Sequence, residues 1–338
     1  MERPGNVTRQ DGAGGSTAAQ MTIVMYHYVR DLARSAFPRI KGLTVDGFRH
    51  QLDYIARYYE VIRMEDLLAA VTDGAALPPN ALLLTFDDGF SDHYQTVSPL
   101  LAERGWQGSF FPCTQPLMEQ KVLDVHKIHF VLATVDDAGR LVRELDQLLG
   151  WEMPGGTARP TVDEVHRYDQ AAVTTFKRLL QRELPRPVRE RLVDHFFRRY
   201  VTQDEAAFAR ELYASVDQLR EMRAAGMYLG CHGHTHVWFD HLTPDELEDE
   251  LHRSLTFLAA AELGAAPWVM CYPYGGYAPD LAPVMRRHGC AAGLLAEPGI
   301  ADIASDAALA LPRLDTNDLP QQPVTVPAVW TRRVLEGA

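Results

Sequence analysis

The chain has few cysteines, no long apolar run and a shortage of basic residues, and each of these features excludes a class of protein. Its four cysteines are scattered over 338 residues, and no pair has zinc-knuckle or thioredoxin spacing, so we expect buried free thiols in a reducing compartment. No apolar stretch approaches a membrane span, and the N-terminus lacks the apolar core of a signal peptide, so a cytoplasmic location is expected. The net charge of −12 argues against nucleic acid as the main partner, since phosphate binding needs a basic face.

The remaining composition is that of a globular α/β protein. Residues 1–20 are rich in Gly, Ala, Thr and Ser and predict a disordered tail, so one domain over residues 21–338 is expected. Alternating strand and helix patterns predict a parallel sheet with right-handed crossovers, either open or closed as a barrel. Between about residues 123 and 214, heptad-like apolar spacing and dense charge predict a helical insertion.

The chain is organised around the stretch Thr85-Phe86-Asp87-Asp88-Gly89. An apolar run, 81–84, leads into it and predicts a buried strand. Successive strand residues point to opposite faces, so both acids reach one site only if the strand ends before them and Gly89 permits a turn. Paired carboxylates at the end of such a strand indicate an active site, although a capped solvated turn is the alternative.

Two further polar clusters also follow predicted strands. In His232-Gly233-His234-Thr235-His236, two imidazoles with one carboxylate would leave open positions on a divalent ion, and the alternative is a polar turn. The stretch 271–276, Cys-Tyr-Pro-Tyr-Gly-Gly, predicts a tight turn that could aim a backbone N–H into a site.

Two single residues complete the candidates. His27 follows the first predicted strand, and a structural histidine is its alternative reading. Arg313 is a candidate buried cation for one of the acids, with a surface arginine as the alternative. Carboxylates, histidines and an arginine gathered on one rim would fit metal-assisted hydrolysis.

In order and context, these motifs resemble those of carbohydrate esterase family 4, the NodB-type polysaccharide deacetylases. The resemblance covers residues 21–121 and 216–315 and implies a deformed (β/α) barrel of about seven strands. It implies one divalent metal ion held by Asp88, His232 and His236, with zinc as the first expectation and cobalt, nickel, manganese or iron as alternatives. It also implies that Asp87 is the general base and that the backbone N–H of Tyr274 binds the oxyanion.

Two departures from the family pattern change the expected roles. Cys271 stands where the third motif usually has an arginine, and we infer that Arg313 supplies the missing guanidinium. No Leu-x-His motif follows residue 315. However, Met25-Tyr26-His27 resembles the N-terminal motif of the circularly permuted poly-N-acetylglucosamine deacetylases, which makes His27 the candidate general acid.

The expected reaction is removal of an N-acetyl group from an amino sugar or glycan precursor, giving acetate and a free amine. The expected partner is therefore an N-acetylated carbohydrate, and no nucleic acid or membrane span is expected. The alternatives are a deformylase or other non-peptide amide hydrolase using the same site, and a catalytically inactive glycan-binding barrel. The insertion could cap the rim and set specificity, mediate dimerisation, or be a passive solvated face.

Overall fold

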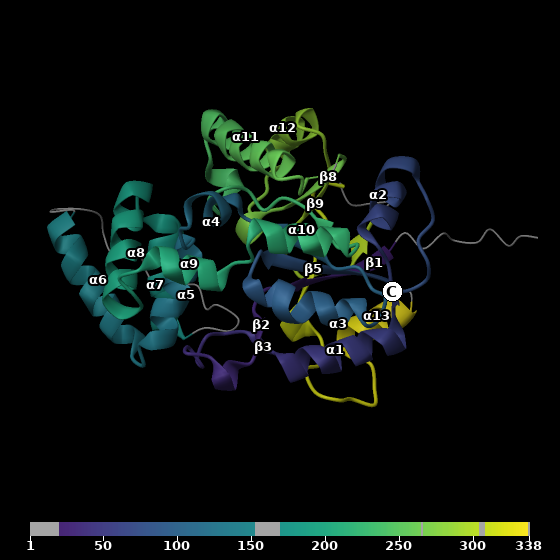
Figure 1. The fold of residues 1–338 in the computed structure, drawn as a ribbon, viewed down its shortest axis with the longest axis horizontal. Helices are drawn as coiled ribbons and strands as arrows, with labels where there is room; N and C mark the ends of the chain where they lie inside the picture. The colour runs from purple at the N-terminus through teal and green to yellow at the C-terminus, as the bar shows by residue number, and fades with distance from the viewer. Residues whose placement is uncertain (1–19, 153–169, 265, 304–307, 337–338) are drawn as a thin grey trace, which may run out of the picture.

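The structure is a computed structural model that describes residues 20–152, 170–264, 266–303 and 308–336. The predicted disordered tail lies outside these residues, apart from Gln20, which begins the first strand. Figure 1 shows the two parts of the molecule, a strand-containing part and a group of helices at its side.

The strands form a closed parallel ring. Hydrogen-bonded ladders join, in this order, β1 (Gln20–Tyr26), β5 (Ala81–Asp88), β6 (Ser109–Pro112) and β7 (Tyr228–Leu229). A bridge between Cys231 and Met270 continues the ring into β8 (Trp268–Cys271) and β9 (Cys290–Leu294). A second bridge, from Leu294 to Leu311, leads to β11 (Leu314–Asp315), which pairs with β1. The expected deformed (β/α) barrel is confirmed.

Shorter strands extend this ring. They are β2 (Val29–Arg30) paired with β3 (Leu43–Thr44), β4 (Glu60–Val61) beside the start of β5, and β10 (Ala301–Asp302), antiparallel to the start of β1. The helices that accompany the barrel are α1 (Val45–Tyr58), α2 (Met64–Asp73), α3 (Ser98–Ala102), α4 (Thr114–Glu119), α10 (Val216–Ala224), α11 (Pro244–Ala260), α12 (Ala282–Arg287) and α13 (Val329–Glu336).

Local sequence signals explain where several helices begin and end. The Thr44 side chain accepts the Gly47 N–H at the start of α1. Thr243 and Glu246, three residues apart, form a capping box at the start of α11. Helix α2 ends at Gly74, which has the left-handed φ of 69° that glycine adopts without a steric penalty.

Alternation along β5 divides the core into two layers. Leu83 packs in one cluster with alternate residues of the other barrel strands, which places it inside the barrel. Leu82, Leu84 and Phe86 pack in a second cluster with residues of the surrounding helices. Asp87 follows Leu83 on the inward row, so the period of two brings its carboxylate to the mouth of the barrel.

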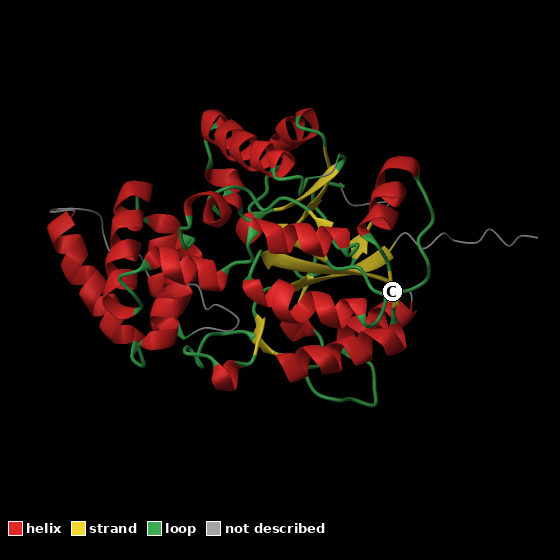
Figure 2. Cartoon of the chain, in the orientation of Figure 1, coloured by secondary structure: helices red, strands yellow, loops and turns green. Residues whose placement is uncertain are grey.

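Between α4 and α10 the regular elements of the described chain are helical (Figure 2). These elements are α5 (Asp124–Thr134), α6 (Ala138–Glu152), α7 (Ala171–Arg178), the π-helical turn η3 (Leu179–Glu183), α8 (Arg186–Tyr200) and α9 (Glu205–Leu212). They gather at the left of Figure 1 around an apolar core that also includes Tyr28, Phe90 and Cys113 from the loops of the barrel. Buried Lys127 ties three of them together, since its Nζ lies 2.5 Å from Asp194 Oδ1 and 2.9 Å from Glu205 Oε1. Within the described ranges, no helix is long and apolar enough to cross a membrane.

One local expectation was wrong. The strand was expected to end before the paired acids, but the β5 ladder runs through both, and Asp88 pairs with Pro112. The turn begins at Asp88 itself, whose φ is 77°, and continues through Gly89 at 73°. This left-handed conformation breaks the strand alternation, so the two neighbouring carboxylates reach the same end of the barrel.

Candidate active site and metal centre

The predicted site residues come together at one mouth of the barrel. The acids end β5, the histidine cluster follows β7, Tyr274 follows β8 and His27 follows β1. A cavity of about 220 Å³ lies at this mouth, and seven of the predicted residues line it: Asp87, Asp88, His27, His232, His236, Tyr274 and Arg313. Only a bridge at Leu311 precedes Arg313, and the two-residue strand β11 follows it, so sequence patterning found no strand beside this arginine.

Asp87 is held by a buried bidentate ion pair with Arg313. The two guanidinium N–H groups lie 2.9 and 2.8 Å from its two carboxylate oxygens. Arg313 is 1% exposed, and its Nε donates to the Leu295 carbonyl at 2.6 Å. Burial raises the pKa of Asp87, but Arg313, with His232 and His27, outweighs burial and lowers that pKa to about 2. Arg313 therefore pairs with Asp87, the acid that is expected to act as the general base.

Asp88 faces the two outer histidines of the cluster. Its Oδ1 lies 3.4 Å from His232 Nε2 and 3.4 Å from His236 Nε2. This oxygen is buried and takes no hydrogen bond from any described residue. The His232 Nδ1 bonds the Cys271 carbonyl at 2.6 Å, which leaves its Nε2 lone pair available. An orphaned carboxylate oxygen and two imidazole nitrogens fit the donor set of a divalent metal ion.

The pKa shifts of Asp88 and His236 are also consistent with a metal site at this centre. Burial opposes ionisation of Asp88, but His126, His232 and His236 outweigh it and hold the pKa of Asp88 well below its usual range. Burial lowers the pKa of His236 to about 4. At His232, burial also lowers the pKa, but Cys271 and Asp88 outweigh it and raise that pKa well above the ordinary value. Asp88 therefore stays ionised, as a carboxylate ligand of a metal ion requires.

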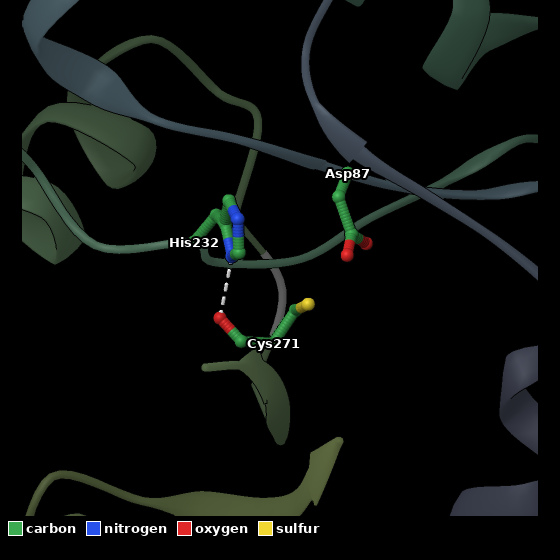
Figure 3. A group of neighbouring side chains, drawn as sticks. All are labelled: Asp87, His232 and Cys271. Carbon is green, nitrogen blue, oxygen red and sulfur yellow. Dashed lines mark hydrogen bonds between the residues drawn. The ribbon is translucent and has the colours of Figure 1, made fainter. Parts of the chain in front are cut away.

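Among the described residues, two groups have possible ligand atoms that all lie within 4.8 Å of one another; each contains a cysteine and neither includes His236. Both fit a metal ion less well than Asp88, His232 and His236. One joins Asp87, His232 and Cys271, and the other joins Asp88, Cys113 and His232. In the first, Asp87 is already occupied by Arg313, and His232 bonds the carbonyl of Cys271 rather than its thiol (Figure 3). In the second, the Cys113 thiol donates to the His232 carbonyl at 3.1 Å. Burial raises the pKa of both thiols, which disfavours the thiolate that a metal requires.

His27 and Tyr274 flank this centre. The His27 Nε2 lies 3.9 Å from Asp87 Oδ2, and its side chain is 39% exposed, so it is open to the cavity. Tyr274 has a φ of 58°, and its ring stacks on Trp238 at 4.7 Å and meets the His236 ring edge-on at 4.5 Å. The tight turn predicted for this motif is therefore present, and its aromatic side chain packs against His236.

Sequence reasoning allowed the insertion to cap the rim but did not identify the residues that line this cavity. Val125, His129, Lys177 and Gln181 line it from α5, α7 and η3. His126 bonds Asp88 directly, with 3.1 Å between Nε2 and Oδ2. By contrast, the middle histidine of the cluster, His234, is buried against Thr114 and does not line the cavity. Only the period of α5, which places residues 125, 126 and 129 on neighbouring positions, hinted at this face.

A family model described as polysaccharide deacetylase matches residues 195–293. The match contains His232, His236 and Tyr274, but not the paired acids. The resemblance to the NodB-type deacetylases inferred from the motifs is thereby confirmed. No curated protein sequence matches the chain.

Solved deacetylase structures share the fold. The deacetylase PplD of Streptococcus pyogenes, in complex with acetate, has a TM-score of 0.53 at 16% identity, covering 94% of this chain and 97% of that one. The BpsB deacetylase domain of Bordetella bronchiseptica has 0.51 at 18%, covering 88% and 96%. IcaB of Ammonifex degensii has 0.50 at 16%, covering 82% and 84%. At these identities the likeness concerns the fold.

Proposed function

We propose that the chain is a metal-dependent N-deacetylase that hydrolyses the acetamide of an amino sugar or glycan precursor. One observation carries the proposal: two adjacent buried carboxylates have different partners. Asp87 is paired with Arg313, whereas Asp88 turns a hydrogen-bond-free oxygen toward His232 and His236. This asymmetry gives one acid the role of base and the other the role of metal ligand. The family match and the shared fold support the same reaction class.

Asp88, His232 and His236 would hold the metal ion. When bound there, a divalent ion such as zinc supplies Lewis acidity toward the amide carbonyl and lowers the pKa of water. The resemblance assigns the backbone N–H of Tyr274 to the oxyanion. Its turn depends on Gly275, whose φ is 75°.

Asp87 and His27 would move the protons. Asp87 accepts a proton from the attacking water, and protonated His27 donates one to the amine nitrogen as the C–N bond breaks. Because the pKa of Asp87 is about 2, it retains a proton poorly. His27, with 3.9 Å between Nε2 and Oδ2, is near enough for the proton to return to it with small side-chain movement or through one water.

Two pockets that share lining residues favour a substrate longer than one sugar. A pocket of about 390 Å³ lies beside the catalytic cavity and shares Gln181, His236 and Tyr274 with it. Insertion residues line both hollows, which favours the role in specificity among the three expected for the insertion. An N-acetylated oligosaccharide or a sugar carrying a second group would occupy both spaces.

A metal-loaded activity screen tests the proposal. Chelator-stripped protein is reloaded with zinc, cobalt, nickel, manganese or iron, and acetate release is measured from nucleotide-linked N-acetyl sugars through to oligomers. We expect turnover only with metal, and loss of both metal and turnover in Asp88→Ala. The exposed Asp53, which pairs with Arg104, provides the matched control, since Asp53→Ala should retain both.

The outcomes separate the alternatives. A metal-free Asp88→Ala variant with full activity would refute the site. Release of formate from N-formyl sugars, without acetate from their acetyl analogues, would identify a deformylase. Stoichiometric metal without turnover on any substrate would favour a glycan-binding barrel.

A further inference from the structure

His126 is a buried histidine that the proposed reaction does not use. It comes from α5 of the insertion, outside the residues that match the family model. Its side chain is 1% exposed, and its Nε2 lies 3.1 Å from Asp88 Oδ2, the oxygen that does not face His232 and His236. The insertion therefore contacts the other side of the carboxylate that is proposed to hold the metal.

The hydrogen bonds around Tyr213 determine which nitrogen of His126 carries the proton. The Tyr213 hydroxyl accepts the Leu123 N–H at 3.1 Å and lies 2.6 Å from His126 Nδ1. If Nδ1 carried the proton, the lone pair of Nε2 would face a carboxylate oxygen and repel it. The Tyr213 hydroxyl therefore donates its hydrogen bond to Nδ1, which carries no proton, and the Nε2–H of His126 donates to Asp88.

This chain of donors fixes the rotation of the Asp88 carboxylate. With Oδ2 held by His126, Oδ1 is the oxygen presented at 3.4 Å to both His232 Nε2 and His236 Nε2. The Phe90 ring lies 4.7 Å from the His126 ring and is stacked on Tyr213. This aromatic packing holds His126 and Tyr213 in place beside Asp88.

We propose that His126 is a positioning residue for the metal ligand Asp88, and that Tyr213 sets its tautomer. The inference rests on the proposed function, because it takes Asp88 as a ligand. Its consequence is that the insertion contributes to metal affinity as well as lining the substrate cavity. Partners of this kind typically contribute about 10- to 100-fold to metal affinity.

Metal affinity, measured apart from turnover, tests this proposal. Stripped wild-type and variant proteins are titrated with zinc against a chromophoric chelator, and the visible spectrum of the cobalt-loaded protein reports the ligand geometry. We expect His126→Ala to weaken zinc binding by about 10- to 100-fold and to change the cobalt spectrum. His126→Gln should recover part of the affinity, because its amide N–H is able to donate. Tyr213→Phe should weaken binding less than His126→Ala.

Tyr200→Phe is the matched control. It removes a hydroxyl from the same insertion, where Tyr200 bonds Glu144 away from the cavity, and should leave zinc affinity unchanged. The inference would be overturned if His126→Ala and Tyr213→Phe both kept the zinc affinity and cobalt spectrum of the wild type. It would also be overturned if these variants, free of metal, melted at a lower temperature but bound zinc with unchanged affinity. If His126→Ala does not fold, Tyr213→Phe carries the test.

Asp88→Ala separates this inference from the proposed function. If Asp88→Ala loses zinc while the His126 and Tyr213 variants bind normally, only the inference fails. If Asp88→Ala binds zinc as the wild type does, the metal site of the proposed function is wrong.

Discussion

Replacing Arg313 with Met should show how much the buried ion pair between Asp87 and Arg313 contributes to the stability of the fold. The substitution leaves Asp87 in a site where the carboxylate is 2% exposed and loses both guanidinium hydrogen bonds, at 2.8 and 2.9 Å. Removing one partner of a buried ion pair costs about 3–5 kcal/mol, since the remaining charge is uncompensated. Arg313→Lys should also be destabilising, because an ammonium group does not reproduce the bidentate geometry.

The contribution of Asp87 to folding stability should depend on pH in opposite directions in the wild type and in Arg313→Met. In the wild type, the pKa of Asp87 is lowered to about 2 from an ordinary 3.8, so its ionisation stabilises the fold by about 2 kcal/mol above pH 3.8. This contribution is lost as the pH falls through 2. In Arg313→Met, burial then dominates and raises the pKa of Asp87. That variant should therefore gain stability relative to the wild type as the pH is lowered from 7 to 4.

Urea unfolding of chelator-stripped protein measures both effects. A double-mutant cycle with Asp87→Asn isolates the pair, and we expect Arg313→Met to cost much less in that background. The exposed Arg34, paired with Asp31 at 4.0 Å, provides the control. Its replacement by Met should change the unfolding free energy by less than about 1 kcal/mol. The same cost of Arg313→Met with and without Asp87→Asn would show that the ion pair does not act as described.

Three further substitutions test the proposed roles. Asp87→Asn should retain metal while turnover falls by about 10²–10⁴-fold, and a retained rate would exclude it as the base. His27→Ala should lower turnover over a similar range without loss of metal, and a near-normal rate would place the acid elsewhere, for example at another cavity histidine. Gly275→Ala should cost about 1–3 kcal/mol in urea unfolding and impair turnover, because a Cβ there would lie 2.8 Å from the Ala296 nitrogen. Gly74→Ala, at a φ of 69° with no atom within 4 Å, should cost less, and equal costs would show that crowding at Ala296 is unimportant.

Sequence patterning succeeded where each strand was long and ended in polar residues. The apolar run before Asp87 was read correctly because a strand buried on both faces must be apolar throughout. It did not foresee that the ladder continues through Asp88, since a non-glycine residue with a φ of 77° is uncommon and has no composition signal. The inferred pairing of an acid with Arg313 required chemical reasoning, because the strand beside that arginine is too short to produce a pattern.

The insertion illustrates a different limit. Its heptad-like apolar spacing predicted helices, but periodicity only assigns a residue to a face of its own helix. Which barrel loop that face meets depends on long-range packing. His126 could therefore be named as a polar residue of a helix, but its contact with Asp88, 38 residues earlier in the chain, could not be predicted.

The end of the insertion is tied to the loop that follows the paired acids. Phe90 forms an antiparallel bridge with Tyr213, the Ala214 N–H donates to the Gly89 carbonyl at 3.0 Å, and the Ser91 hydroxyl donates to the Glu211 carbonyl at 2.8 Å. Backbone amides shared in this way are released only when both parts open together. The catalytic loop and the insertion should therefore exchange hydrogen as one cooperative unit. Excising residues 123–214 to obtain a minimal barrel would then also remove the bonding partners of the loop that carries the acids.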